Sequence, residues 1–304
     1  IKNIIEFYKF YKKIKPDIVL HYTIKPNIYG TIACNLLGIK IVNNIAGLGT
    51  LFIKQNIVTK IAKCLYKYSQ SKADKIFFQN SDDYEIFTSE GLVEKSKCDV
   101  LPGSGVDTSK FVPIEYIKED DKFIFLLIAR MLWDKGVGEY VAAAKIIKSK
   151  YPTVEFQLLG FLDVINKSAI SKKQMQEWVD EGVINYLGVS DNVKEEIAKA
   201  DCIVLPSFYR EGTPRTLLES ASMAKPIITT DNVGCRDVVD DVVNGYLCEV
   251  RNSQDLADKM EMMLNLPEDE RKLMGEAGRN KMINEFDEKI VINRYLEVIK
   301  KLVK

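Results

Sequence analysis

The stretch LPSFYREGTPRTLLESASMAKPIITTDNVGCRDVVDDVVNGY, residues 205–246, says more about the fold than any other part of the chain. The run DCIVL at 201–205 predicts a strand that leads into it. Thr213 followed by Pro214 predicts a helix directly after this strand, because threonine favours the N-cap and proline the first helical position. A helix that starts at the carboxyl end of a strand presents unpaired backbone N–H groups there. Such a helix start can hold an anion without a dedicated side chain.

Two carboxylates flank this helix start. Glu211 precedes the predicted helix, and Glu219 lies eight positions later on the helix itself. At a rise of 1.5 Å per residue, Glu219 lies about 7.5 Å along the helix from its predicted first residue, Pro214. Taken alone, this spacing favours a solvated helix face. With an anion-binding turn between the two carboxylates, it also suits a ligand with a charged middle and hydroxyl groups at both ends, such as a nucleotide-sugar.

A pair of cations follows another predicted strand. The continuous apolar run at 124–129 is typical of a parallel strand buried on both faces, and it leads into Arg130, Lys135 and Gly136. A helix over about 137–150 is predicted next. Two cations at the carboxyl end of a strand can stabilise a diphosphate leaving group. The alternative interpretation is a pair of solvated loop cations.

Strands and helices alternate along the whole chain. In the first part, strands are predicted at 17–20, 40–42, 75–79 and 98–101, and helices at 1–14, 26–37, 55–69 and 81–90. In the second part, strands are predicted near 123–129, 155–160, 184–187, 201–205, 226–230 and 246–250, with final helices at 267–284 and 286–304. Short connections between alternating elements predict parallel sheets covered on both faces. Gly160 and Gly188 end two of the strands, where glycine allows a close backbone approach or a tight turn.

Composition describes an ordinary globular protein. The 304 residues are 46% hydrophobic and 28% charged, which is enough chain for two α/β domains. No apolar run approaches 18 residues, and no secretory signal is visible. The six cysteines form no Cys-x-x-Cys pair, and the single histidine is His21. This pattern argues against a zinc site and predicts reduced thiols in a cytoplasmic protein.

The charge is unevenly distributed. Residues 1–72 carry twelve lysines against two acidic residues, a net charge of +10, which the remainder of the chain balances. Segments 1–16 and 54–72 interleave lysine with Ile, Phe, Tyr and Leu at helical spacing, which suits a face lying on anionic lipid headgroups. Two solvated amphipathic helices packed on a sheet are the alternative. Nucleic acid is a poorer interpretation, because no nucleic-acid-binding motif accompanies the lysines.

These motifs together resemble the family 4 glycosyltransferases. The resemblance rests on Glu-x7-Glu at 211–219, Arg-x4-Lys-Gly at 130–136, Pro-Ile-Ile-x-Thr at 226–230 and the crossing segment LPGSGVDTSKF at 101–111. It implies the GT-B architecture, an α/β fold of two Rossmann-like domains that face each other across a cleft. The expected parts are an acceptor-side domain at 1–111, a nucleotide-sugar-binding domain at 112–285 and a C-terminal helix at 286–304 that returns to the first domain. Because the chain begins at a helix, we expect the first domain to lack its initial strands.

Three further segments narrow the resemblance. HYTIKPNIYG at 21–30, AGLG at 46–49 and FFQNSDD at 77–83 look like bacterial members that extend polyprenyl-diphosphate-linked glycans for O-antigen or capsule. The resemblance implies a set of acceptor-side residues: His21, Lys25, Asn27, Gly47, Leu48 and Gly49. It implies a set of donor-binding residues: Gly160, Leu187, Gly188, Gly212, Thr213, Pro214, Arg215, Leu218 and Glu219. One departure is that NNIAG at 43–47 lacks the histidine found there in many relatives, and a lone histidine such as His21 is more often structural.

The implied activity is a retaining transfer of a hexose or N-acetylhexosamine from a UDP-sugar to a polyprenyl-diphosphate-linked glycan. Glu211, Arg130 and Lys135 would be catalytic, and no metal or cofactor is expected. The enzyme would work at the cytoplasmic face of the inner membrane, on its anionic surface. Rival interpretations are a UDP-sugar epimerase, a sugar phosphorylase or an inactive, truncated sugar-binding protein. A hydride-transfer enzyme is disfavoured, because no Gly-x-Gly-x-x-Gly follows a strand.

Overall fold

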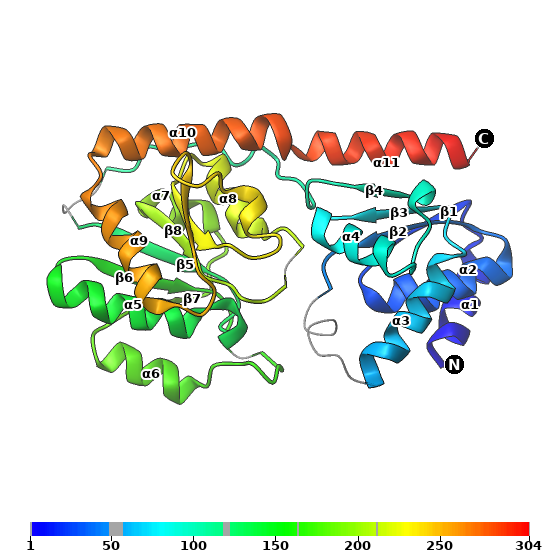
Figure 1. The fold of residues 1–304 in the computed structure, drawn as a ribbon, viewed down its shortest axis with the longest axis horizontal. Helices are drawn as coiled ribbons and strands as arrows, with labels where there is room; N and C mark the ends of the chain where they lie inside the picture. The colour runs from blue at the N-terminus through cyan, green and yellow to red at the C-terminus, as the bar shows by residue number, and fades with distance from the viewer. Residues whose placement is uncertain (1, 49–56, 118–121, 163, 211, 304) are drawn as a thin grey trace. The chain divides into compact units, whose positions relative to one another are not determined.

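A computed structural model describes residues 2–48, 57–117, 122–162, 164–210 and 212–303 of the protein. The chain forms two compact units, each with its own sheet and core (Figure 1). Unit 1 comprises Ile1–Gly105, Arg210–Thr213 and Glu288–Lys304. Unit 2 comprises Val106–Tyr209 and Pro214–Asp287.

Unit 1 is built on four parallel strands in the order β1-β2-β3-β4. The strands are β1 (Ile18–Tyr22), β2 (Lys40–Ile45), β3 (Lys75–Phe78) and β4 (Cys98–Val100). The helical elements are α1 (Lys2–Ile14), the π-helix η1 (Pro26–Gly30), α2 (Thr31–Leu37), α3 (Ile57–Gln70), α4 (Ser81–Ser89), the 3-10 turn η3 (Lys95–Lys97) and α11 (Glu288–Leu302). Each strand pairs with the next one along the chain, as short helical connections require.

Successive side chains of these strands point to opposite faces, so the sheet of unit 1 has two apolar sides. Ile76 and Phe78 of β3 face a core shared with α1, α2 and α3. Phe77, between them, packs against Val291 and Tyr295 of α11 instead. Helices α1, α2 and α3 therefore cover one face of the sheet, and α11 covers the other (Figure 1).

Unit 2 is built on six parallel strands in the order β10-β9-β8-β5-β6-β7. The strands are β5 (Ile124–Ile128), β6 (Glu155–Leu159), β7 (Asn185–Gly188), β8 (Cys202–Leu205), β9 (Ile227–Thr230) and β10 (Gly245–Cys248). The helical elements are η4 (Trp133–Lys135), α5 (Val137–Lys150), α6 (Lys172–Asp180), α7 (Val193–Lys199), α8 (Arg215–Ser222), η5 (Arg236–Val238), α9 (Ser253–Asn265) and α10 (Glu268–Glu285).

The chain order reverses between β5 and β8. From β5 it proceeds outward to β6 and β7, then returns to place β8 on the other side of β5. In open parallel sheets, ligands bind outside the carboxyl ends of the strands at such a switch point. The topology thus singles out the loops that follow β5 and β8.

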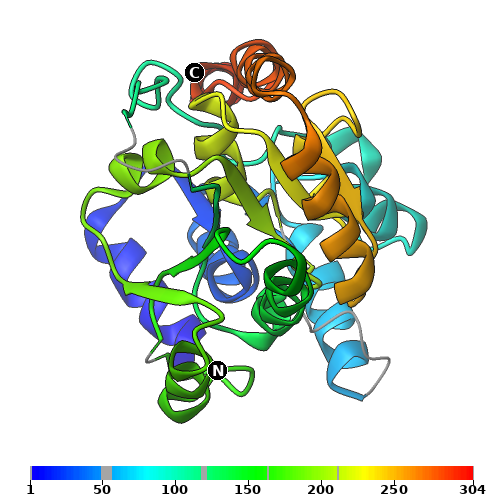
Figure 2. The same ribbon diagram turned by 90° about the vertical axis from the view of Figure 1, so that its left-hand side faces the viewer.

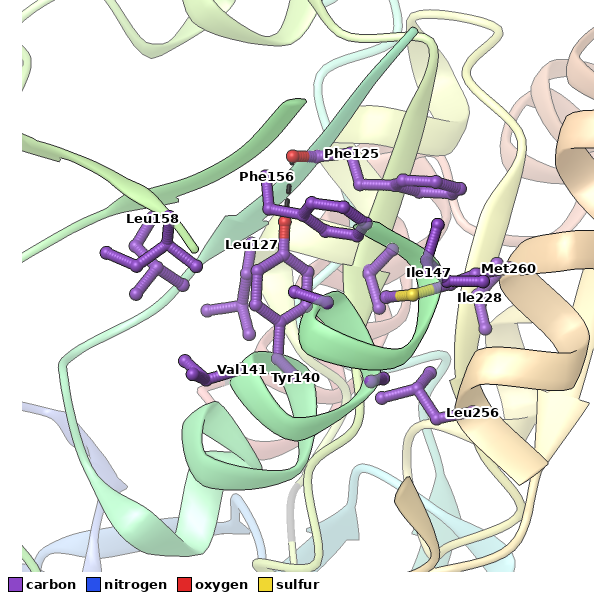
Figure 3. Close-up of a cluster of buried hydrophobic side chains, with 14 of the residues drawn as sticks. Phe125, Leu127, Tyr140, Val141, Ile147, Phe156, Leu158, Ile228, Leu256 and Met260 are labelled. Atoms are coloured by element: carbon purple, nitrogen blue, oxygen red, sulfur yellow. Dashed lines mark hydrogen bonds between the residues drawn. The ribbon is translucent and has the colours of Figure 1, made fainter. Parts of the chain in front are cut away.

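Helices cover both faces of the sheet of unit 2. Helices α5 and α9 pack side by side on one face (Figures 1 and 2), and α8 and α10 pack on the other. On the α5 side the rings of Phe125 and Phe156 stack with centroids 5.4 Å apart. The buried Tyr140 hydroxyl of α5 donates a hydrogen bond to the Phe125 carbonyl oxygen at 2.8 Å (Figure 3). These contacts hold α5, and the loop before it, in register with β5.

The predicted α/β fold with parallel sheets is confirmed, and all ten predicted strands form within three residues of their expected ends. The predicted helix at 26–37 begins as a π-helix, η1, and continues as α2. None of the helices formed by the described residues is both long and apolar enough to cross a membrane.

Candidate functional site

The loop after β5 carries the two predicted cations. Arg130 is exposed directly after the strand, and Lys135 ends the short helix η4. Gly136 then starts α5 in the left-handed conformation, at φ +76°. A Cβ atom at this position would lie 2.0 Å from the Pro206 carbonyl oxygen, so only glycine lets this loop approach the one after β8. Lys135 is thereby held at the switch point of the sheet.

The loop after β8 is hydrogen-bonded to the loop after β5 on one side and to the loop after β9 on the other. The carbonyl oxygen of Asp134 accepts hydrogen bonds from the backbone N–H groups of Phe208 and Tyr209, at 3.1 and 3.0 Å. The Ser207 hydroxyl donates to the same oxygen at 3.3 Å. On the opposite side the Asn232 side-chain amide, after β9, donates to the Tyr209 carbonyl oxygen at 3.0 Å. The loops after β5, β8 and β9 therefore form one connected rim, which sequence reasoning did not identify.

Gly160 and Gly188, at the ends of β6 and β7, have different roles. A Cβ atom on Gly160 would lie 1.9 Å from the Ala129 carbonyl oxygen, and its φ is +140°. Glycine is thus required at position 160 because the backbone of Ala129, just after β5, leaves no space for a side chain. Gly188, at φ +74°, has open space where a Cβ atom would point, and its carbonyl oxygen accepts from the Gly160 N–H at 2.7 Å. Leu187 beside it is 39% exposed, so this part of the edge stays accessible.

The predicted N-cap of α8 is wrong by one residue. The helix begins at Arg215, and its N-cap is Pro214, which has no capping side chain. Thr213 lies one position before this N-cap, and its hydroxyl donates to the Gln79 carbonyl oxygen in unit 1, at 3.2 Å. Gly212 belongs to unit 1 as well, where a Cβ atom would lie 2.6 Å from the Ala46 carbonyl oxygen. The first turn of α8 still presents backbone N–H groups at the carboxyl edge of β8.

Glu219 lies one turn into α8, with its side chain 14% exposed. The Arg215 guanidinium lies 3.1 Å from its carboxylate. Burial raises the pKa of the Glu219 carboxyl above its usual value, and Arg215 opposes this shift. Leu218, in contrast, is fully buried in the core between α8 and the sheet, so its side chain supports the helix. Glu219 is the acidic side chain of α8, and it remains partly accessible beside the exposed Arg215.

His21 lies in a buried polar network of unit 1. Its Nε2 atom is 3.0 Å from the Tyr11 hydroxyl, and its Nδ1 atom is 2.9 Å from Asn43 Oδ1. Burial lowers the pKa of the imidazole, and the hydrogen bond with Asn43 opposes this shift. With both ring nitrogens engaged and the side chain 2% exposed, this geometry favours a structural role.

The other acceptor-side candidates spread around the ends of β1 and β2. Lys25 is exposed and Leu48 is buried, whereas Gly47 is half-buried at φ +110°. The Asn27 side-chain amide donates to the Asn44 carbonyl oxygen at 2.7 Å, and its Oδ1 atom is buried without a hydrogen-bond partner among the described residues. Gly49 and Glu211 lie outside the described residues.

Acidic, histidine and cysteine side chains are scattered rather than clustered. Across the described part of the chain, no three of them come together in a way that could hold a metal ion. All six cysteines are free thiols.

Comparison with known proteins places this arrangement in a family. A family model described as glycosyl transferases group 1 matches residues 110–281, and one described as glycosyl transferase 4-like matches residues 1–80. The N,N'-diacetylbacillosaminyl-diphospho-undecaprenol alpha-1,3-N-acetylgalactosaminyltransferase of Campylobacter jejuni is 30% identical over 324 residues, covering 100% of this chain and 82% of that protein. The UDP-Gal:alpha-D-GlcNAc-diphosphoundecaprenol alpha-1,3-galactosyltransferase of Escherichia coli is 26% identical, covering 94% of this chain and 76% of that protein.

Solved structures agree on the fold. A glycosyltransferase from Rickettsia africae superposes with a TM-score of 0.81 at 22% identity, covering 100% of this chain and 81% of that one. Anabaena Alr3699/HepE in complex with UDP also gives 0.81, at 16% identity, covering 98% and 82%. The predicted GT-B fold and family are confirmed. The chain belongs to the group 1 glycosyltransferases, and it is a glycosyltransferase enzyme.

Proposed function

We propose that this enzyme transfers a hexose or N-acetylhexosamine from a UDP-sugar to a polyprenyl-diphosphate-linked glycan, with retention of the anomeric configuration. Two relatives named for transfer to diphospho-undecaprenol-linked sugars support the acceptor class. The observation that carries the proposal is that Lys135 lies beside Tyr209, in the loop between β8 and α8, at the switch point of the sheet of unit 2.

The chemistry follows from where charge develops. As the bond between the anomeric carbon and the diphosphate oxygen breaks, negative charge grows on the departing UDP. Arg130, Lys135 and the N-terminal turn of α8 stabilise that charge, more strongly in the transition state than in the bound donor. The acceptor hydroxyl oxygen forms the new bond on the same face of the sugar, and its proton passes to the departing diphosphate. This route requires no covalent nucleophile, no metal and no cofactor.

A transfer assay tests the proposal. The purified chain is incubated with labelled UDP-hexoses and UDP-N-acetylhexosamines and an undecaprenyl-diphosphate-linked sugar, and the product linkage is read by nuclear magnetic resonance. We expect an α-linked product from an α-configured donor. A β-linked product would contradict retention. Conversion of the UDP-sugar to its epimer without an acceptor, or no turnover with any donor, would contradict the transferase.

The two glutamates are expected to act on opposite ends of the donor. Glu219→Ala should weaken the binding of UDP itself about tenfold, because the carboxylate would accept hydrogen bonds from the ribose hydroxyls. Glu211→Ala should leave UDP affinity unchanged and impair transfer, because Glu211 would address the sugar. Calorimetry with UDP and turnover measurements separate the two effects, and exposed Glu195→Ala serves as the control. The reverse pattern would exchange the two roles.

Unit 1 offers a surface suited to the membrane that holds such an acceptor. Helices α1 and α3 lie on the same face of its sheet. Both expose large apolar side chains: Ile5, Phe10, Ile14, Ile57, Ile61 and Tyr68. They also expose lysines: Lys2, Lys9, Lys12, Lys13, Lys60 and Lys67. Lysines near an anionic surface contribute about 1 kcal/mol each, and the apolar side chains allow shallow insertion. The enzyme would then lie on the cytoplasmic face of the inner membrane.

We therefore expect the protein to sediment with anionic vesicles in a salt-sensitive manner and not with neutral vesicles. The double change Phe10→Ser and Ile14→Ser should reduce sedimentation, because it removes two apolar side chains more than half exposed on α1. Leu273→Ser, at an equally exposed leucine of α10 in unit 2, is the matched control. Equal binding to both vesicle types would show that these lysines only solvate helices, and a soluble acceptor would then be the better proposal.

A further inference from the structure

An aromatic ring lies beside the cation of the candidate diphosphate site. The Nζ atom of Lys135 is 5.5 Å from the centroid of the Tyr209 ring, and both side chains are half-buried. A lysine ammonium within about 6 Å of an aromatic centroid is attracted to the electron-rich face of the ring. Tyr209 comes from the loop after β8, whereas Lys135 comes from the loop after β5.

Backbone hydrogen bonds hold Tyr209 and Lys135 beside each other. The residue before Lys135, Asp134, accepts the Tyr209 N–H at its carbonyl oxygen, and Asn232 holds the Tyr209 carbonyl from the other side. The residue before Tyr209, Phe208, lies under the Arg251 guanidinium, 4.4 Å from the ring centroid to Cζ. Two successive aromatic side chains of one loop are thus each paired with a different cation. Phe208 contacts Arg251, in the segment before α9, whereas Tyr209 contacts Lys135.

We infer that Tyr209 is a positioning residue that holds the Lys135 ammonium where the donor diphosphate binds. A lysine side chain has four rotatable bonds, so ordering it costs conformational entropy when the ligand arrives. A ring that already holds the ammonium reduces that cost, which is the general advantage of a preorganised site. The inference rests on the proposed function of Lys135 and adds a residue to it.

The ring, and not the hydroxyl group, carries this role. Tyr209→Phe keeps the ring and should change the dissociation constant for UDP less than twofold. Tyr209→Leu removes the aromatic face and should raise that constant about fivefold. Pentafluorophenylalanine at position 209 has nearly the shape of phenylalanine but an electron-poor face, so it should behave like leucine. Comparing phenylalanine with its fluorinated analogue holds packing constant, which protects the test if the leucine variant folds poorly.

A double-mutant cycle tests whether Tyr209 acts through Lys135. UDP affinity is measured by calorimetry for the wild type, Tyr209→Leu, Lys135→Ala and the double variant. We expect Tyr209→Leu to have less than a twofold effect in the Lys135→Ala background, because the ring then has no ammonium to hold. Phe208→Leu is the matched control, since it changes the neighbouring aromatic residue and should show no coupling to Lys135.

The outcomes separate the two proposals. If Lys135→Ala leaves UDP affinity unchanged, the proposed diphosphate role of Lys135 fails, and the inference fails with it. If Lys135→Ala weakens binding but Tyr209→Leu has the same effect in both backgrounds, the function stands and the positioning role is refuted. Loss of affinity in Tyr209→Phe equal to that in Tyr209→Leu would assign the effect to the hydroxyl group and overturn the inference as well.

Discussion

Replacing Lys135 with alanine is expected to lower turnover by about 10²–10³-fold, and replacing Arg130 with alanine should have an effect of the same size. This is the scale for removing one group that stabilises charge in a transition state. Both residues follow β5 at the switch point of the sheet, where charge on the departing diphosphate would develop. Their side chains are not needed for the core, so the fold should remain intact.

Steady-state turnover with the donor identified by the transfer assay measures this effect. Lys173→Ala is a suitable control, because that side chain is 88% exposed on α6 in the same unit. Its ion pair with Glu177 on the same helix is exposed, and such pairs contribute little to stability. Wild-type-like turnover in both the Arg130 and Lys135 variants would contradict the assignment of the diphosphate site.

Gly160→Ala is expected to destabilise the protein by about 3 kcal/mol or more. The position has φ +140°, a conformation essentially confined to glycine, which costs other residues about 1–3 kcal/mol. In addition, the new Cβ atom would meet the Ala129 carbonyl oxygen at 1.9 Å, so the exits of β5 and β6 would have to separate. Arg130 follows directly after Ala129, and we therefore expect transfer to fall together with stability.

Gly188→Ala provides a matched comparison at the end of the next strand. Its φ of +74° is also positive, but in the part of the chain that the structure describes no atom beyond its two chain neighbours lies within 4 Å of the position that a Cβ atom would take. Its cost should be about 1–2 kcal/mol, from backbone conformation alone. Urea unfolding followed by circular dichroism gives both values. Equal stability losses in the two variants would show that the contact with Ala129 is easily relieved.

Local sequence signals were sufficient for the elements and the family. Continuous apolar runs such as 124–129 predicted parallel strands buried on both faces, because they have the length of a strand and are too short for a buried helix. Turn and helix signals between them produced the alternation that defines the fold class. Arg130, Lys135 and Glu219 were identified because each lies at a fixed spacing from a strand end, and spacing along the chain is a sequence property.

Contacts between residues far apart in the sequence could not be predicted from these local patterns. Thr213 is a good N-cap by composition, yet its hydroxyl donates to the Gln79 carbonyl oxygen, 134 positions away. Gly160 was expected to allow a close backbone approach or a tight turn, and the structure shows that the backbone approaching it is that of Ala129. A histidine at a strand end is compatible with chemistry or with structure, and only the hydrogen bonds with Tyr11 and Asn43 distinguish the two for His21.

Short stretches of the chain were enough to predict two parallel sheets, a resemblance to glycosyltransferases, and cations and carboxylates after particular strands. Hydrophobic period, turn chemistry and motif spacing act over a few residues, so they can be read without a structure. The position of β8 beside β5 became visible only in the folded chain, where the Lys135 Nζ atom lies 5.5 Å from the Tyr209 ring centroid although 74 positions separate the two residues. Strand order depends on which buried faces and backbone groups fit together across the whole sheet. No short stretch of the chain contains enough information to predict that fit.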